Sequence, residues 1–234
     1  REGTGEPIGI PMVLYMHELF PFWKAFLTEL GYQVVPSERT NKKVIRGGIE
    51  TIIVETCFPV KLAHGHLLNL LTRGVKNIFL PSLINLKSAH GGQSSNTFAC
   101  PYAQSLPYTV RGSVNFEMYG ARLLSPVIHF GEGEETALAN LAAFGKSVGI
   151  SKKRIAAAYR VASEAQDRFY RLTKEAGRTF LENTGDDEKI MMIIGRPYNS
   201  TDSGANLNIQ RKLIDLGVRP IPMDMVSGLG SDDN

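Results

Sequence analysis

Apolar and polar residues alternate along the chain in short blocks that predict strands and helices in turn. A helix is expected from Pro21 to Gly31, because the apolar residues between them share one helical face and proline suits the first helical turn. The same signals predict a helix from Pro59 to Gly74. Runs of β-branched and aliphatic residues predict the strands. In chain order, the expected strands are 12–16, 33–36, 51–54, 77–80, 123–130, 189–194 and 219–223.

Further helices complete the predicted order, and one long segment has no regular pattern. From residue 81 to about 106 the residues are mostly small and polar, so we expect a functional loop that ends at Cys100 and Pro101. The strand at 189–194 is typical of a strand buried on both faces. The remaining expected helices are 41–46, 134–148, 152–180 and 207–216.

This alternation predicts the α/β class, with mostly parallel, doubly wound sheets of the Rossmann or flavodoxin-like kind. We expect two halves with a cleft between them. Residues 1–150 form the first α/β half, which carries Cys57 and Cys100, and residues 151–185 form a long bridging helix. Residues 186–234 are the start of a second half that is truncated here, so we expect the chain to be a piece of a longer polypeptide.

Composition narrows the function classes without naming one. The chain has 234 residues, 43% of them hydrophobic, which is enough for a packed core. No apolar run reaches the roughly 18 residues of a membrane span, and no signal peptide pattern is present, so we expect a cytoplasmic protein with no membrane partner. The net charge of +3 is too mild to indicate nucleic-acid binding. Two cysteines do not make a disulfide framework.

Ligands of doubly wound sheets lie beyond the carboxyl ends of the strands, so the residues just after each predicted strand are the candidates for chemistry. His17 and Glu18 follow the first strand and are a candidate acid–base pair, although such a pair is more often part of a turn. Cys57 follows the third strand and begins a helix, where the helix dipole favours a thiolate. Cys100 follows another strand and the loop. Both sulfurs are therefore candidate metal ligands in one crevice.

Two thiolates do not complete a common metal site, because zinc takes four ligands and cubane clusters take three or four cysteines. A missing ligand is expected from His64 or His66 for zinc, from a second chain, or from sequence outside these residues. His66 points away from His64 on a helix, so a helical histidine pair is not expected. Lys61 and His64 are candidates for a cationic collar around a thiolate, cluster or thioester. The alternative is that each cysteine is a small buried hydrophobe.

The segment after the strand at 189–194 is a candidate binding loop. Arg196 suits bidentate contact with an anion, and Asn199 suits recognition of an amide; Tyr198 lies between them. We therefore expect Arg196, Tyr198 and Asn199 to bind a cofactor or a phosphate-bearing ligand. The glycine spacings of the Walker and dinucleotide fingerprints are absent, so ATP binding by this chain is not expected.

Several motifs together resemble the activase-related domain of the 2-hydroxyacyl-CoA dehydratase and CoA enzyme activase family. The most specific is the ten-residue run Cys-Phe-Pro-Val-Lys-Leu-Ala-His-Gly-His at 57–66. The resemblance covers nearly the whole chain. The other matching motifs are Gly9-Ile10-Pro11, Pro21-Phe22-Trp23, Gly31-Tyr32-Gln33-Val34-Val35, Ile78-Phe79-Leu80-Pro81, Cys100-Pro101-Tyr102, Gly195-Arg196-Pro197-Tyr198-Asn199 and Asn206-Leu207-Asn208-Ile209.

The resemblance implies a domain of a long bacterial protein that works with an ATPase activase module in the same or another chain. It implies that Cys57 and Cys100 ligate an iron–sulfur cluster, either [4Fe-4S] or double-cubane, which receives low-potential electrons. The related dehydratase subunits use three cysteines, and this chain has no third one. The implied substrate is an acyl-CoA or another small molecule. Whether the chain belongs to a dehydratase-like lyase or to an ATP-driven reductase stays open.

Two other hypotheses remain beside the iron–sulfur domain. One is a non-catalytic docking or CoA-binding domain of a multidomain activase, without a cluster. The other is a zinc site formed by Cys57, Cys100 and His64. Iron and sulfide binding that depends on both cysteines separates the first hypothesis from these two.

Overall fold

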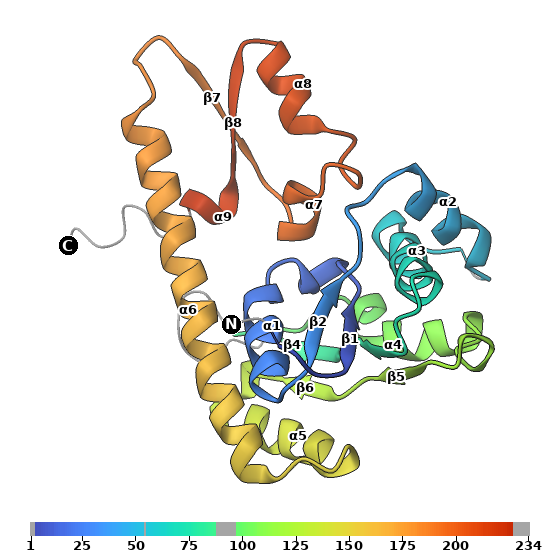
Figure 1. The fold of residues 1–234 in the computed structure, drawn as a ribbon. Coiled ribbons are helices and arrows are strands. Elements are labelled where there is room, and N and C mark those ends of the chain that lie inside the picture. Colours follow the sequence, from blue (N-terminus) through green and yellow to red (C-terminus); the bar gives the residue numbers. More distant parts are fainter. Residues whose placement is uncertain (1–2, 54, 88–96, 227–234) are drawn as a thin grey trace.

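Strand β1 (Pro7–Ile10) lies inside a parallel sheet in the computed structural model of the chain (Figure 1). The structure describes residues 3–53, 55–87 and 97–226. Within this part the sheet order is β2-β1-β3-β5, and each neighbouring pair is parallel. This confirms the predicted α/β class with parallel sheets. The partners of β1 are β2 (Gln33–Pro36), β3 (Asn77–Phe79) and β5 (Arg122–Leu124).

Two further strands, β4 (Ser82–Asn85) and β6 (Val127–His129), continue the direction of β3 and β5 and pair in parallel with each other. Pro81 and Pro126 stand at the breaks, since proline has no N–H to donate to a sheet. Backbone hydrogen bonds still cross both breaks at 3.0 and 2.8 Å. The strand predicted at 123–130 is therefore two short strands.

Helices cover both faces of this sheet. Helix α1 (Phe20–Glu29) lies on one side and α3 (Phe58–Thr72) on the other (Figure 1). Gly9 lets α3 approach β1, because a Cβ there would stand 3.1 Å from a methyl group of Leu70. The other helices are α2 (Lys42–Thr51), α4 (Pro101–Ser113), α5 (Glu134–Ser147), α6 (Lys152–Glu182), α7 (Pro197–Thr201), α8 (Ile209–Asp215) and α9 (Met223–Val226), with 3-10 turns η1 (Leu14–Met16), η2 (Glu117–Tyr119) and η3 (Phe130–Glu132).

The core lies between this sheet, α1 and the first half of α6. Trp23 is fully buried and packs edge-on against Phe22, with ring centroids 4.9 Å apart. Its ring centroid is also 4.9 Å from that of Phe79 on β3. Such aromatic contacts add to the stabilisation from apolar burial. The apolar face that predicted a helix from Pro21 is therefore the face that fills the core.

Helix α6 is 31 residues long and runs along one side of the molecule in Figure 1. Its first half buries Ile155, Ala158 and Ala162 against the core. Further along, Gly177 contacts α9, because a Cβ there would stand 1.9 Å from the carbonyl oxygen of Met225. The division of the chain at residues 150 and 185 stays a prediction.

The second sheet consists of β7 (Lys189–Ile193) and β8 (Val218–Pro222), which pair in parallel. The sequence predicted a strand at 189–194 that is buried on both faces, and this burial is wrong. Ile190, Met191 and Met192 are 42%, 47% and 49% exposed, so both faces of β7 meet solvent. Apolar composition produced the prediction, but no layer of the described structure covers this strand.

Three element predictions fail for local reasons. Residues 12–16 are not a strand: η1 covers Leu14–Met16, with Leu14 at a positive φ of 47°. Residues 51–53 are not a strand, because α2 runs through Gly47 and Gly48 to Thr51; residue 54 lies outside the described residues. Helix α4 was missed inside the predicted loop at 81–106, of which 88–96 also lie outside the described residues.

One glycine of α2 and one of α3 let these helices pack closely. A Cβ on Gly48 would stand 2.2 Å from the carbonyl oxygen of Lys61, and one on Gly65 would stand 1.9 Å from that of Val44. The backbones of α2 and α3 therefore touch at Gly48 and Gly65. The sequence had instead predicted that the first of these helices ends before Gly47 and Gly48. No helix in the described part of the chain is both long and apolar enough to span a bilayer.

Candidate functional site

The two cysteines occupy matching positions in the fold. Cys57 is the N-cap residue of α3 and Cys100 the N-cap residue of α4, and both helices have proline in their first turn. Both thiols are free and both residues are exposed. Each sulfur therefore lies at the positive end of a helix dipole. The alternative of two buried cysteines is wrong.

The route to Cys57 differs from the prediction. Cys57 follows helix α2 in the chain, whereas the sequence predicted that it follows a strand. Its place comes from the α2–α3 contact at the glycines and from the proline in the first turn of α3. Next to Cys57, the hydroxyl oxygen of Thr56 is buried and has no hydrogen-bond partner.

Both cysteines act on one tyrosine hydroxyl. The pKa of Tyr198 is raised to about 12, mainly by burial and then by the charge of Tyr15; Cys100 and Cys57 raise it further, whereas Arg196 lowers it. Electrostatic influence on one hydroxyl requires that both sulfurs lie in its neighbourhood. Helices α3 and α4 contact each other, α3 contacts η1, and α7 packs on η1. The segments that carry residues 57, 100 and 198 are therefore neighbours in the fold, although they are far apart in the sequence.

Aromatic contacts fix α7 against η1 at this point. The rings of Tyr15 and Tyr198 meet edge-on with centroids 5.7 Å apart. The guanidinium of Arg196 lies 5.9 Å from the centroid of the Tyr15 ring, within the range of a cation–π contact. The Tyr15 hydroxyl is buried and has no hydrogen-bond partner. We call Cys57, Cys100, Tyr198, Tyr15 and Arg196 the cysteine site.

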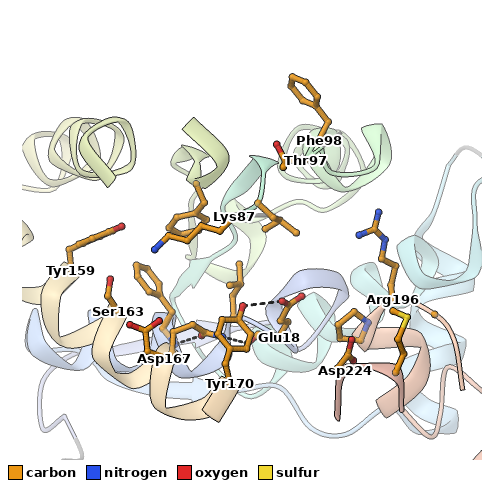
Figure 2. Close-up of a pocket in the computed structure, with 18 residues that line it drawn as sticks. Glu18, Lys87, Thr97, Phe98, Tyr159, Ser163, Asp167, Tyr170, Arg196 and Asp224 are labelled. Carbon is orange, nitrogen blue, oxygen red and sulfur yellow. Dashed lines mark hydrogen bonds between the residues drawn. The ribbon is translucent and has the colours of Figure 1, made fainter. Parts of the chain in front are cut away.

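A cleft of about 440 Å³ adjoins the cysteine site and shares Arg196 with it. It lies between α6, the end of η1, the segment around Phe98 and the start of α7 (Figure 2). Lys87 and Tyr159 stand at one end, and Arg196 and Asp224 at the other (Figure 2). Its walls carry aromatic side chains, as small-molecule sites commonly do.

Glu18 is the central acid of the cleft. The hydroxyl of Tyr170 donates a hydrogen bond of 3.0 Å to Glu18 Oε1 (Figure 2). Burial raises the pKa of Glu18 above its ordinary value, against the effect of the Tyr170 hydrogen bond; Asp224 raises it further, and Arg196 lowers it. Burial also raises the pKa of Asp224. Two carboxyl groups with raised pKa values thus line the cleft together with the Arg196 guanidinium.

His17 has a different environment from Glu18. Its Nε2 lies 3.9 Å from Asp202 Oδ2, and burial lowers its pKa despite the attraction of that carboxylate. Glu18 bonds to Tyr170, so the two neighbours in sequence do not face a common partner. The structure brings Glu18 into the cleft and His17 into a separate polar cluster.

Lys61 and His64 lie on α3, beyond Cys57. Lys61 pairs with Glu55. His64 is 2% exposed, and its Nδ1 lies 3.1 Å from the carbonyl oxygen of Val60. Burial lowers the pKa of His64. Asn199 is exposed on α7.

The described residues give no support to the zinc hypothesis, which stays untested. Within 3–53, 55–87 and 97–226, no group of three or more His, Cys, Asp or Glu side chains is arranged to hold a metal ion. Cys57, Cys100 and His64 therefore do not form a ligand set. His66 is 1% exposed and engaged with Ser37 and Thr40.

Sequence reasoning missed Tyr15, Thr40, Tyr170, Asp202 and Asp224. Tyr170 lies 152 residues from its partner Glu18, and Asp202 lies 162 residues from Thr40. No periodicity or motif signals such pairs. One weak signal for Tyr170 was present in the sequence. This residue lies on the predicted long helix, which was expected to bridge the two halves and so to border the cleft between them.

Comparison with known proteins gives one match. The family model described as "CoA enzyme activase uncharacterised domain (DUF2229)" matches residues 7–226. No curated protein and no solved structure matches the chain. The matched span includes both cysteines and the whole cleft.

Proposed function

Since the chain belongs to the family of CoA enzyme activase domains, we propose that it is an iron–sulfur redox domain fed with low-potential electrons by an ATP-dependent activase. Cys57 and Cys100 would provide two thiolate ligands of the cluster, [4Fe-4S] or double-cubane. The observation that carries the proposal is the placement of two exposed thiols at the N-termini of two helices that contact each other. A cytoplasmic location is part of the proposal.

The donor set fits part of a cluster site. Thiolates are the ligands that iron–sulfur clusters use, and both helix N-termini offset the negative charge of such a group. The buried, unpartnered hydroxyl of Tyr15 also suits a site that holds a hydrogen-bond acceptor. Because the chain has two cysteines, any third thiolate comes from outside these 234 residues. When bound, such a cluster supplies one-electron transfer.

The chain's own residues have separate roles in this proposal. Arg196 offers a fixed positive charge between the cysteine site and the cleft. Glu18 and Asp224 offer carboxyl groups whose raised pKa favours the proton-carrying form. The aromatic walls exclude water from a small acyl-CoA-like substrate that would be reduced or dehydrated there.

The experiment is anaerobic reconstitution with iron and sulfide, with a small exogenous thiol added to occupy the ligand position that this chain lacks. We expect visible absorbance and several irons per chain, both lost in Cys57→Ser and in Cys100→Ser. Thr72→Ser, on the exposed far end of α3, is the matched control and keeps the cluster. A colourless, iron-free protein would contradict the proposal.

A first stage tests convergence without any cluster. Phenylarsine oxide binds two neighbouring thiols together, so we expect one equivalent per chain to bind tightly to the apoprotein. Either cysteine-to-serine variant removes this binding. If arsenical capture succeeds and iron fails to bind, the alternative function gains: a docking or CoA-binding domain without a cluster, in which Arg196 and Lys87 would contact the anionic parts of CoA.

A further inference from the structure

A buried run of hydrogen bonds, separate from the cleft, connects the first sheet to the end of α7. The backbone N–H of Met12 donates to Ser37 Oγ at 2.8 Å, and Ser37 Oγ lies 2.8 Å from His66 Nδ1. On the other side of the ring, His66 Nε2 lies 3.0 Å from Thr40 Oγ1. The Thr40 hydroxyl donates to Asp202 Oδ2 at 2.5 Å.

The direction of each hydrogen bond follows from the two ends of the run. Thr40 gives its single hydroxyl proton to the Asp202 carboxylate, so it accepts from His66 Nε2, which therefore carries the ring proton. His66 Nδ1 is then an acceptor and receives the hydroxyl proton of Ser37. This tautomer is assigned from the network. Every donor and acceptor in the run is matched, and Ser37 and His66 are 6% and 1% exposed.

Asp202 also holds its own loop in place. Its Oδ1 accepts from the backbone N–H of Gly204 at 2.9 Å and of Ala205 at 3.3 Å. The loop presses on Thr40, because a Cβ on Gly204 would stand 2.5 Å from Thr40 Cβ. The side chain of Asp202 is only 8% exposed. A loop from the second sheet is therefore fastened to the first sheet at one buried carboxylate.

The position of Asp202 ties this contact to the cysteine site. Asp202 directly follows α7, and its backbone N–H bonds to the carbonyl oxygen of Tyr198 at 3.4 Å. Helix α7 carries Tyr198, and Arg196 is its N-cap residue. Because α7 is only five residues long, fixing its C-terminal end fixes both side chains.

We propose that Ser37, His66, Thr40 and Asp202 form a latch that positions α7 on the first sheet, and so sets Tyr198 against Tyr15 and Arg196 at the cleft. These four are positioning residues. The latch acts on α7 and not on a cluster, so the inference stands or falls separately from the proposed function.

Thr40→Val tests the latch, because valine keeps the shape of threonine and removes the hydroxyl that joins His66 to Asp202. We expect hydrogen–deuterium exchange in residues 197–208 to rise by about tenfold or more, with β1 and β3 unchanged. Thr40→Ser keeps the hydroxyl and restores slow exchange. Thr72→Val removes a hydroxyl that bonds within α3 and is the matched control. Unchanged exchange at 197–208, or an equal rise in β1 and β3, would overturn the proposal.

The second readout is at the cysteines. In the metal-free protein we expect Thr40→Val to raise the rate of iodoacetamide alkylation of both Cys57 and Cys100 by about threefold or more, since Tyr198 moves away from them. Thr40→Ser keeps the wild-type rates. Suppose that hydrogen–deuterium exchange in α7 rises but the alkylation rates of both thiols stay unchanged. That result would overturn the claim that the latch positions the cysteine site.

Asp202→Asn is the second variant if Thr40→Val does not fold. It keeps the size of the side chain and removes the carboxylate charge, and the same two changes are expected. Iron binding that fails in the wild-type chain, with both latch readouts as expected, would contradict the proposed function and leave the latch intact.

Discussion

The first region (residues 3–147) and the second region (residues 189–226) are built from the same strand-helix-strand units, yet they differ in how deeply the strands are buried. In β1, Ile8 and Ile10 are fully buried. In β7, Met191 and Met192 are about half exposed, at 47% and 49%. Parallel pairing and apolar composition are common to both strands.

The difference shows that a parallel strand is buried only when other layers cover it. Helices α1 and α3 cover the two faces around β1 (Figure 1). In the second region, Ile221 of β8 is the one buried hydrophobic residue among residues 189–226 that the structure describes. The first region therefore carries the stability of the fold, and the latch and α6 hold the second region to it.

The largest expected effect is a loss of stability from Trp23→Ala. Trp23 is fully buried in the core of the first region, so its truncation leaves a cavity and lowers the free energy of unfolding by about 3–5 kcal/mol. Met191→Ala, on half-exposed β7, lowers it by less than about 1 kcal/mol. Denaturant unfolding followed by circular dichroism measures both. Equal losses would break the comparison between the two regions.

The second prediction concerns the pH dependence of stability that is due to His66, a residue of the latch between the two regions. Burial lowers the pKa of His66 to about 4, against the attraction of Asp202; His17 lowers it further. Between about pH 6.5 and 4 the unfolded chain binds a proton at this residue and the folded chain does not, so stability falls as pH falls. The loss from this residue is about 3 kcal/mol and is complete below the folded pKa.

Unfolding free energies measured from pH 7 to 4 check this expectation. His66→Gln removes this group and makes the slope in that window shallower; the part due to His17 and His64, whose pKa values burial also lowers, remains. His129→Gln changes a half-buried histidine elsewhere and retains the slope, since His66 is still present. A slope in His66→Gln as steep as in the wild type would show that another group causes it.

A smaller effect is expected for Arg196→Ala, which removes the cation shared by the two sites. If CoA binds in the cleft, the loss of one charge-assisted contact weakens its affinity by about tenfold or more, with the fold unchanged. Arg211→Ala, on exposed α8, is the matched control and leaves affinity unchanged. Calorimetric titration with CoA measures both. Equal affinities in the wild type and Arg196→Ala would remove Arg196 from the binding site.

The smallest expected effect is that of Met192→Lys in β7. Because this side chain is half exposed, the change alters the free energy of unfolding by no more than about 0.5 kcal/mol. It also lowers self-association, since it interrupts an exposed apolar surface. Denaturant unfolding and light scattering are the measurements. A loss of several kcal/mol would mean that β7 is buried in solution.

Local signals in the sequence predicted the elements that depend on local physics. Proline in the first turn and a one-sided apolar stripe predicted α1 and α3, and β2 was predicted with its observed bounds. The pair Gly47-Gly48 was misinterpreted, because glycine marks both helix ends and close helix contacts. Helix α4 was missed because the small and polar residues before it predicted a loop up to about residue 106, and the helix begins inside that range.

The candidate site was predicted in the same uneven way. Cys57, Cys100, Arg196 and Glu18 were singled out because each lies at the start of a helix or just after a predicted strand. Their partners were not, because contact between residues more than a hundred positions apart leaves no trace in one sequence. Tyr170 and Asp202 are two such partners.

The sequence by itself determined the α/β class, the parallel pairing and the placing of Cys57 at a helix N-terminus, since proline, glycine and apolar spacing act over a few residues. Only the tertiary structure decided that Cys100 also begins a helix, that this helix contacts the one that Cys57 begins, that Glu18 and Asp224 share a cleft, and that β7 is exposed. These depend on how layers pack. Packing depends on the apolar surface that the whole chain buries and on steric contacts between distant segments. The backbone contact at Gly48 and Gly65 is one such contact.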